Sequence, residues 1–171
     1  MDAEELVFID ETWTPTCMTR RCGRAPKGKR CIASAPHGHW KTTTFVGALR
    51  RKRSTAPMVT DGPINREMFL AYVREFLCPT LQPVDIVILD NLSSHKVSGV
   101  EEAIRATGAT LLYLPPYSLG FNPIEKFFSK LKSLLRTAAK RSIDALWKEA
   151  GGLLNAVAQA SIQTSSPHAD M

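Results

Sequence analysis

Apolar stretches with strand-like and helix-like spacing alternate along most of this 171-residue chain. Residues 5–12 hold the apolar run Val7-Phe8-Ile9 and predict a first strand. Residues 84–90 are apolar at nearly every position, which is typical of a strand covered on both faces. The same reasoning predicts the remaining strands at 16–24, 30–36, 41–49, 56–59 and 110–114. We expect 30–36 and 41–49 to pair as a hairpin.

Helical periodicity appears between and after these strands. Asn65 is placed as the N-cap of a helix with one apolar face that ends before Pro79. Ser93 or Ser94 caps a helix running to about Thr107, with Gly108 just beyond its end. Two last helices are expected at about 122–139 and 143–160. This order predicts a mixed α/β domain over residues 1–160, followed by a flexible tail, 161–171.

Composition narrows the class of protein. Hydrophobic residues make up 44% of the chain, which favours a globular domain, and the net charge of +6 favours a polyanionic partner. Apolar runs too short to cross a membrane, and an acidic start where a secretory signal is basic, predict a soluble cytoplasmic protein. The four cysteines lack C-x-x-C spacing, so we expect them to be reduced and free of zinc.

Three acids stand at the ends of these elements. Asp10 and Asp90 each close an apolar strand, and Glu125 is the third residue of the helix start Asn122-Pro-Ile-Glu125. If the two strands are neighbours, Asp10 and Asp90 meet at one sheet edge, where ligands of α/β sheets gather. Three such carboxylates repel one another unless cations compensate, and all-oxygen ligation suits Mg²⁺ or Mn²⁺. The pattern therefore favours a two-metal phosphodiester site.

Each acid also has a structural interpretation. Asp10 fits a turn at the end of a strand, and Asp90-Asn91 fits an Asx-turn. Glu125 fits the N3 position of a capping box with Asn122 as N-cap.

Three segments resemble one family of enzymes. Phe8-Ile-Asp10-Glu-Thr, Leu89-Asp90-Asn-Leu-Ser-Ser-His95-Lys and Leu114-Pro-Pro-Tyr-Ser…Asn122-Pro-Ile-Glu125 are similar to motifs of the DDE transposases, in the bacterial insertion-sequence branch of the mariner-like superfamily. The 34 residues between Asp90 and Glu125 agree with that family's spacing. The resemblance implies an RNase H-like mixed sheet flanked by helices, and a triad of Asp10, Asp90 and Glu125 holding two Mg²⁺ or Mn²⁺ ions. It also implies DNA strand cleavage and strand transfer, with transposon ends and target DNA as partners of a nucleoid-associated homo-oligomer.

The chain departs from the family pattern at two places. Leu119-Gly120-Phe121 replaces the usual Pro-x-Leu, which exchanges a rigid proline for a flexible glycine. We also expect the N-terminal helix-turn-helix region of the family to be absent, so that an upstream-frame protein could supply DNA binding. Two alternatives stay open: a stand-alone RNase H-like nuclease without strand transfer, and an inactive remnant that binds DNA or regulates a full-length transposase.

Other residues are candidates for supporting roles. Asn91, His95 and Asn122 are expected to orient the carboxylates or contact phosphate, while Glu11 should face away from Asp10 because neighbouring strand residues alternate. Trp13 and Trp40 either stack on a base or pack within the protein. The expected DNA-binding residues are basic and form three groups: Arg20, Arg21, Arg24 and Lys27; Arg50, Arg51, Lys52 and Arg53; Lys126 and Lys130.

Overall fold

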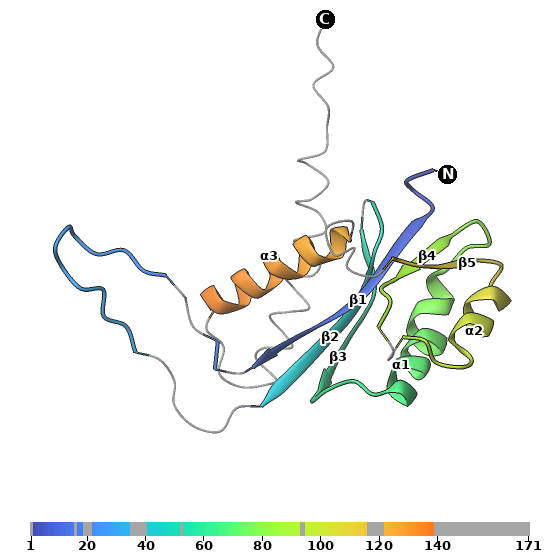
Figure 1. Ribbon diagram of the computed structural model, residues 1–171, viewed down its shortest axis with the longest axis horizontal. Coiled ribbons are helices and arrows are strands. Elements are labelled where there is room, and N and C mark those ends of the chain that lie inside the picture. The colour runs from blue at the N-terminus through green and yellow to red at the C-terminus, as the bar shows by residue number, and fades with distance from the viewer. Residues whose placement is uncertain are drawn as a thin grey trace, which may run out of the picture.

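A five-stranded mixed sheet forms the centre of the protein in the computed structural model (Figure 1). The structure describes residues 2–15, 17–18, 22–34, 41–51, 53–92, 95–115 and 122–138. The strands are β1 (Leu6–Pro15), β2 (Thr42–Leu49), β3 (Ser54–Asp61), β4 (Ile86–Leu89) and β5 (Thr110–Tyr113). The helices are α1 (Arg66–Tyr72), continued by a π-turn (Val73–Leu77) and a 3₁₀-turn (Cys78–Thr80), then α2 (Val100–Ala106) and α3 (Pro123–Ala138).

The strand order β3-β2-β1-β4-β5 combines two kinds of pairing. The first three strands form an antiparallel meander, with Phe8 opposite Leu49. β4 then pairs parallel to β1, with Phe8 opposite Ile88, and β5 pairs parallel to β4. Parallel neighbours require a crossover, which the chain makes through α1 and α2. This topology confirms the expected mixed sheet flanked by helices and the expected proximity of the first strand to the 84–90 strand.

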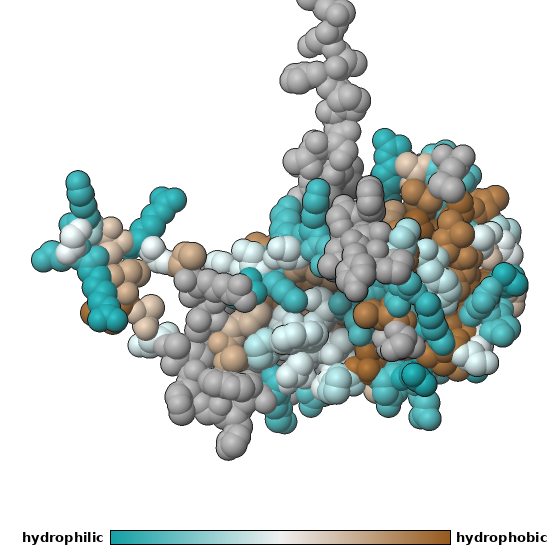
Figure 2. Space-filling model, viewed as in Figure 1, coloured by the Kyte–Doolittle hydropathy of each residue, from teal (hydrophilic) through white to brown (hydrophobic). Residues whose placement is uncertain are grey.

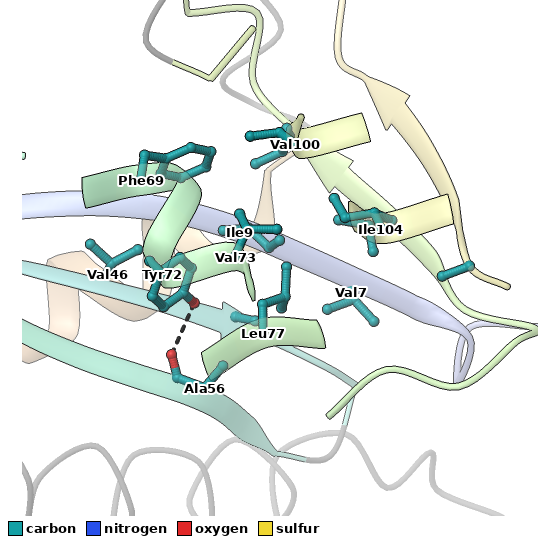
Figure 3. Close-up of a cluster of buried hydrophobic side chains, with 14 residues drawn as sticks. Val7, Ile9, Val46, Ala56, Phe69, Tyr72, Val73, Leu77, Val100 and Ile104 are labelled. Atoms are coloured by element: carbon teal, nitrogen blue, oxygen red, sulfur yellow. Dashed lines mark hydrogen bonds between the residues drawn. The ribbon is translucent and has the colours of Figure 1, made fainter. Parts of the chain in front are cut away.

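Each face of the sheet buries its own apolar cluster because side chains alternate along the strands. Val7, Ile9 and Val46 pack on one face against α1, its continuation and α2 (Figure 3). The Tyr72 hydroxyl within this cluster donates a 2.9 Å hydrogen bond to the carbonyl of Ala56. This bond gives the buried hydroxyl the partner that it needs. Phe45, on the other face, packs against the apolar side of α3. The sheet is therefore the middle of three layers.

The helix ends follow the predicted signals in two places. The Asn65 side chain accepts a 2.8 Å hydrogen bond from the Met68 amide, as expected of an N-cap. Gly108 has φ +85°, a conformation that glycine adopts at little cost, and it follows the end of α2 as expected. Within the described residues, no helix is both long and apolar enough to cross a membrane.

The region between the first two strands was predicted wrongly. β1 continues to Pro15, and the described parts of the expected strands 16–24 and 30–36 lie outside any strand. Residues 22–34 are exposed throughout and stand away from the body of the protein (Figures 1 and 2). The physical reason is that this stretch offers almost nothing to bury: its one large apolar side chain, Ile32, is 87% exposed. β2 pairs with β1 and β3 in place of the expected hairpin partner.

Other boundaries moved or fall beyond the described part. α2 begins at Val100, later than the expected cap at Ser93 or Ser94, both of which lie outside the described residues. The expected helix at 143–160, the tail 161–171 and the departure at 119–121 lie outside them too.

Candidate active site

The carboxyl ends of β1 and β4 place two acids side by side. The parallel register puts Phe8 opposite Ile88, so the chain reaches Asp10 and Asp90 two residues later on each strand. The two side chains lie close enough for repulsion from the Asp90 carboxylate to contribute to the raised pKa of Asp10. The arrangement predicted from the two strand ends is therefore present.

Asp10 is the most perturbed of the three acids. Its side chain is 7% exposed, and one carboxylate oxygen accepts a 2.7 Å hydrogen bond from the Glu11 amide. Burial, together with repulsion from Glu125 and Asp90, raises its pKa from 3.8 to about 7, although the hydrogen bond from Glu11 opposes the shift. A buried carboxyl surrounded by other carboxylates is a position that a cation would stabilise.

Asp90 is half-buried and makes two local contacts. Its Oδ1 atom accepts a 3.2 Å hydrogen bond from the Leu92 amide, which is the Asx-turn considered from the sequence. The same oxygen contacts Nδ1 of His95, five residues later. The turn and the histidine together hold the carboxylate at the end of β4.

His95 is fully buried between these groups. Its ring stacks on Phe69 of α1 with centroids 4.4 Å apart, and its Nε2 atom lies 4.0 Å from Oε2 of Glu11. Burial alone would lower the pKa of His95, but the contacts with Asp90 and Glu11 outweigh it and raise the pKa from 6.5 to about 9. We expect the ring to carry a positive charge at neutral pH.

Asn122 joins the start of α3 to Asp10. Its Oδ1 atom accepts a 3.3 Å hydrogen bond from the Ile124 amide, and its Nδ2 atom donates a 3.4 Å hydrogen bond to Oδ2 of Asp10. The side chain is 4% exposed, so both contacts are shielded from water. Asn122 therefore caps the helix and orients an acid at once.

Glu125 is exposed in the first turn of α3. Its charge helps to raise the pKa of Asp10, so it belongs to the same acidic neighbourhood. Even so, no group of three His, Cys, Asp or Glu side chains in the described part of the chain is arranged to hold a metal ion. The structure brings together Asp10 and Asp90, with the exposed side chain of Glu125 nearby.

Glu11 was underestimated from the sequence. As predicted, it lies on the face of β1 opposite Asp10, but there it approaches His95. It also lines a cavity of about 370 Å³ together with Trp13, which is 64% exposed and lies under Lys132 at 5.6 Å from the ring centroid. The available signal was that Glu11 directly follows Asp10 at the end of the first strand, but nothing in the sequence shows that its side chain would meet His95. Trp40 lies outside the described residues.

The expected DNA-binding residues fall into different environments. Arg50 is 9% exposed and forms hydrogen bonds to both carboxylate oxygens of Asp85, at 2.7 and 2.5 Å, so its guanidinium is occupied inside the protein. The six other expected basic residues in the described part of the chain are exposed: Arg24, Lys27, Arg51, Arg53, Lys126 and Lys130. Asn91, which was expected to orient Asp90, is also exposed. Arg20, Arg21 and Lys52 lie outside the described residues. The expectation for Arg50 is therefore corrected, because its buried ion pair removes it from the surface.

Comparisons with known proteins agree with this architecture. Residues 5–146 match the family described as DDE superfamily endonuclease, while no curated protein sequence matches the chain. Two Mos1 mariner paired-end complexes, with Mn and with Mg, each superpose with a TM-score of 0.73 at 16% identity, over 95% of this chain and 53% and 52% of theirs. The catalytic domain of Mos1 mariner transposase gives 0.61 at 16% identity, over 95% of this chain and 77% of that one. These likenesses establish the RNase H-like fold, and the chain spans about half the length of the Mos1 chains in the two complexes.

Proposed function

Because the chain belongs to the DDE superfamily of endonucleases, we propose that it is a transposase catalytic domain that cleaves and transfers DNA strands. We further propose that it belongs to the bacterial insertion-sequence branch, because its three sequence motifs resemble those of that branch. The observation that carries this proposal is the position of Asp10 and Asp90 on adjacent parallel strand ends, beside the start of the helix that presents Glu125.

The chemistry of these side chains fits two divalent cations. All three are carboxylates, which suit Mg²⁺ or Mn²⁺, and their mutual repulsion contributes to the raised pKa of Asp10. Asp10 and Asp90 would hold the ions together with Glu125, whose exposed side chain is able to turn toward them. When bound, such ions activate the attacking hydroxyl and stabilise the leaving oxygen of the phosphodiester.

The protein's own residues would provide position and charge. Asn122 and the Glu11 amide hold the two oxygens of Asp10, while His95 and the Leu92 amide hold Asp90. Fixed ligands matter because the phosphodiester reaction depends on alignment of its attacking and leaving oxygens. The N-terminus of α3 adds a favourable dipole for the negative charge of Glu125.

DNA is the partner that the charge distribution favours. Lys126 and Lys130 are exposed on the helix that begins beside the acids, and Arg24 and Lys27 are exposed on segment 22–34. Contacts from such residues go to phosphates and position the duplex without reading its sequence. The structural neighbours include a Mos1 paired-end complex with the left transposon end. We propose that transposon-end DNA is likewise the partner of this chain, which would act on it as a homo-oligomer.

The test is Mn²⁺-dependent nicking of supercoiled plasmid DNA. Asp90→Asn should abolish nicking, since it removes a carboxylate ligand with almost no change of shape. Asp61→Asn is the matched control, because Asp61 is exposed at the end of β3 and should leave the rate unchanged. Nicking by Asp90→Asn at the rate of the unaltered protein would refute the proposed function.

A second assay separates transposase from nuclease. Labelled transposon-end DNA and an unlabelled target plasmid are incubated together with Mn²⁺. A transposase joins the label to the target, whereas a nuclease leaves cleaved ends that are never joined.

A further inference from the structure

We infer that Glu11 is a positioning residue, which fixes the ring of His95 and, through that ring, the carboxylate of Asp90. This inference rests on the proposed function, because it assigns Glu11 to the same site. It adds a fourth carboxylate to the neighbourhood of the acids, with a task different from binding metal.

The first argument is the geometry of the His95 ring. Its face is held by Phe69, at 4.4 Å between centroids, and its Nδ1 edge contacts Asp90. The remaining nitrogen, Nε2, points toward Oε2 of Glu11 at 4.0 Å. Turning the imidazole over about its Cβ–Cγ bond would take both nitrogens away from the carboxylates that face them, so Glu11 adds to the orientation that Asp90 already favours.

The second argument is the burial of the two facing atoms. Nε2 of His95 and Oε2 of Glu11 are both buried, and among the described residues neither has a hydrogen-bond partner. Buried polar atoms without partners are costly, and here two complementary ones face each other at slightly more than hydrogen-bond distance. A small shift of either side chain would satisfy both.

The third argument is that Glu11 is linked to both acids, to Asp10 directly and to Asp90 through His95. Its backbone amide donates a 2.7 Å hydrogen bond to Asp10, and its side chain reaches the histidine that contacts Asp90. Alternation along β1 permits this, since the Asp10 side chain lies on the α3 face and the Glu11 side chain lies on the α1 face. Side-chain substitution at Glu11 keeps its amide, so the contact to Asp10 survives and the route through His95 is tested alone.

The first measurement uses the metal-free protein. Long-range ¹H–¹⁵N spectra of the histidine rings are recorded at one fixed pH, with His95 assigned by its loss in His95→Gln. Glu11→Ala should shift or broaden the His95 ring signals, and Glu11→Gln, which keeps a hydrogen-bonding group in place, should change them less. Glu67→Gln is the control, because Glu67 is an exposed carboxylate of α1. His95 signals that are identical in Glu11→Ala and the unaltered protein would overturn the inference.

The second measurement is Mn²⁺-dependent plasmid nicking over a range of Mn²⁺ concentrations. Glu11→Ala should lower the rate or raise the half-saturating Mn²⁺ concentration by about 10- to 100-fold, and Glu11→Gln should restore part of the loss. Equal losses in both variants with unchanged His95 signals would mean that Glu11 acts on the metal directly, and the inference would be wrong. If the unaltered protein fails to nick DNA, the proposed function fails, while the ring spectra still decide whether Glu11 holds His95.

Discussion

Removing the guanidinium of Arg50 should destabilise the protein strongly without weakening its hold on DNA. Arg50 stands in a basic run that the sequence assigns to DNA, yet its Nη atoms bind both carboxylate oxygens of Asp85 and the carbonyl of Thr80. The side chains of Arg50 and Asp85 are 10% and 2% exposed. Arg50→Ala would therefore leave a buried carboxylate with only the 2.6 Å hydrogen bond from the Gln82 amide.

The magnitude follows from burial. Breaking a buried ion pair by removing one partner costs about 3–5 kcal/mol, most of which is the uncompensated charge that stays behind. The neighbouring residue gives a matched control: Arg51 pairs with Glu4 at 3.6 Å, with side chains 54% and 42% exposed. Arg51→Ala should cost below about 1 kcal/mol, as exposed pairs do.

Urea unfolding followed by circular dichroism measures both free energies. Burial alone would raise the pKa of Asp85, but the hydrogen bonds from Arg50 and the Gln82 amide outweigh it and hold the pKa below 3.8. The stabilisation is thus complete above about pH 4 and is lost as the pH falls through the lowered pKa. A double variant, Arg50→Met with Asp85→Leu, should recover most of the loss because neither charge is left unpaired. Equal costs for Arg50→Ala and Arg51→Ala at pH 7 would refute this reasoning.

Three further outcomes are expected. The pKa of Asp10 is raised to about 7 in the folded protein, so the metal-free protein should lose up to roughly 4 kcal/mol of stability as the pH rises from 4 past 7. The free energy of unfolding of Asp10→Asn, measured with urea, should lack this dependence on pH. Asn122→Ala should cost about 0.5–2 kcal/mol as a lost helix cap, measured in the same way, and should also reduce Mn²⁺-dependent nicking because Asp10 loses its hydrogen bond. Lys126→Ala and Lys130→Ala should each reduce the salt dependence of DNA binding, measured by fluorescence anisotropy, by about one in the log–log slope, whereas Arg105→Ala, at an exposed ion pair, should not.

The strands and helices that the sequence predicted well are those with a strong apolar period. Residues 84–90 and the first strand were predicted because a core strand must be apolar over consecutive positions. The structure then shows that these two strands are parallel neighbours. Strands were wrongly expected at 16–24 and 30–36 because scattered cysteine, methionine and isoleucine imitate a strand pattern. Such local spacing cannot show that residues 22–34 stand away from the body with no surface to cover.

The residues of the candidate site that could be predicted are those whose place is set by the end of one strand or the start of one helix. Asp10 and Asp90 were found because strand ends converge in a parallel sheet, and Asn122 because helix starts need a cap. The contact between Glu11 and His95 joins residues 84 positions apart in the chain, and its partners meet only after α1 supplies Phe69. The Arg50–Asp85 pair had only a weak signal in the sequence. Asp85 interrupts an apolar run, and a carboxylate buried in such a run needs a partner of opposite charge.

The structural and catalytic interpretations of the acidic motifs turn out to be compatible. Asn122 caps α3 through one atom of its side chain and donates to Asp10 through another, and Asp90 forms an Asx-turn with the oxygen that contacts His95. A side chain fixed by a turn or a cap has already lost its conformational freedom on folding, so it loses little more when it binds an ion. Under the proposed function, capping at these positions would therefore help to prepare the acids for metal. Glu125 differs because it is exposed, and we expect most of the ordering on metal binding to occur at that residue.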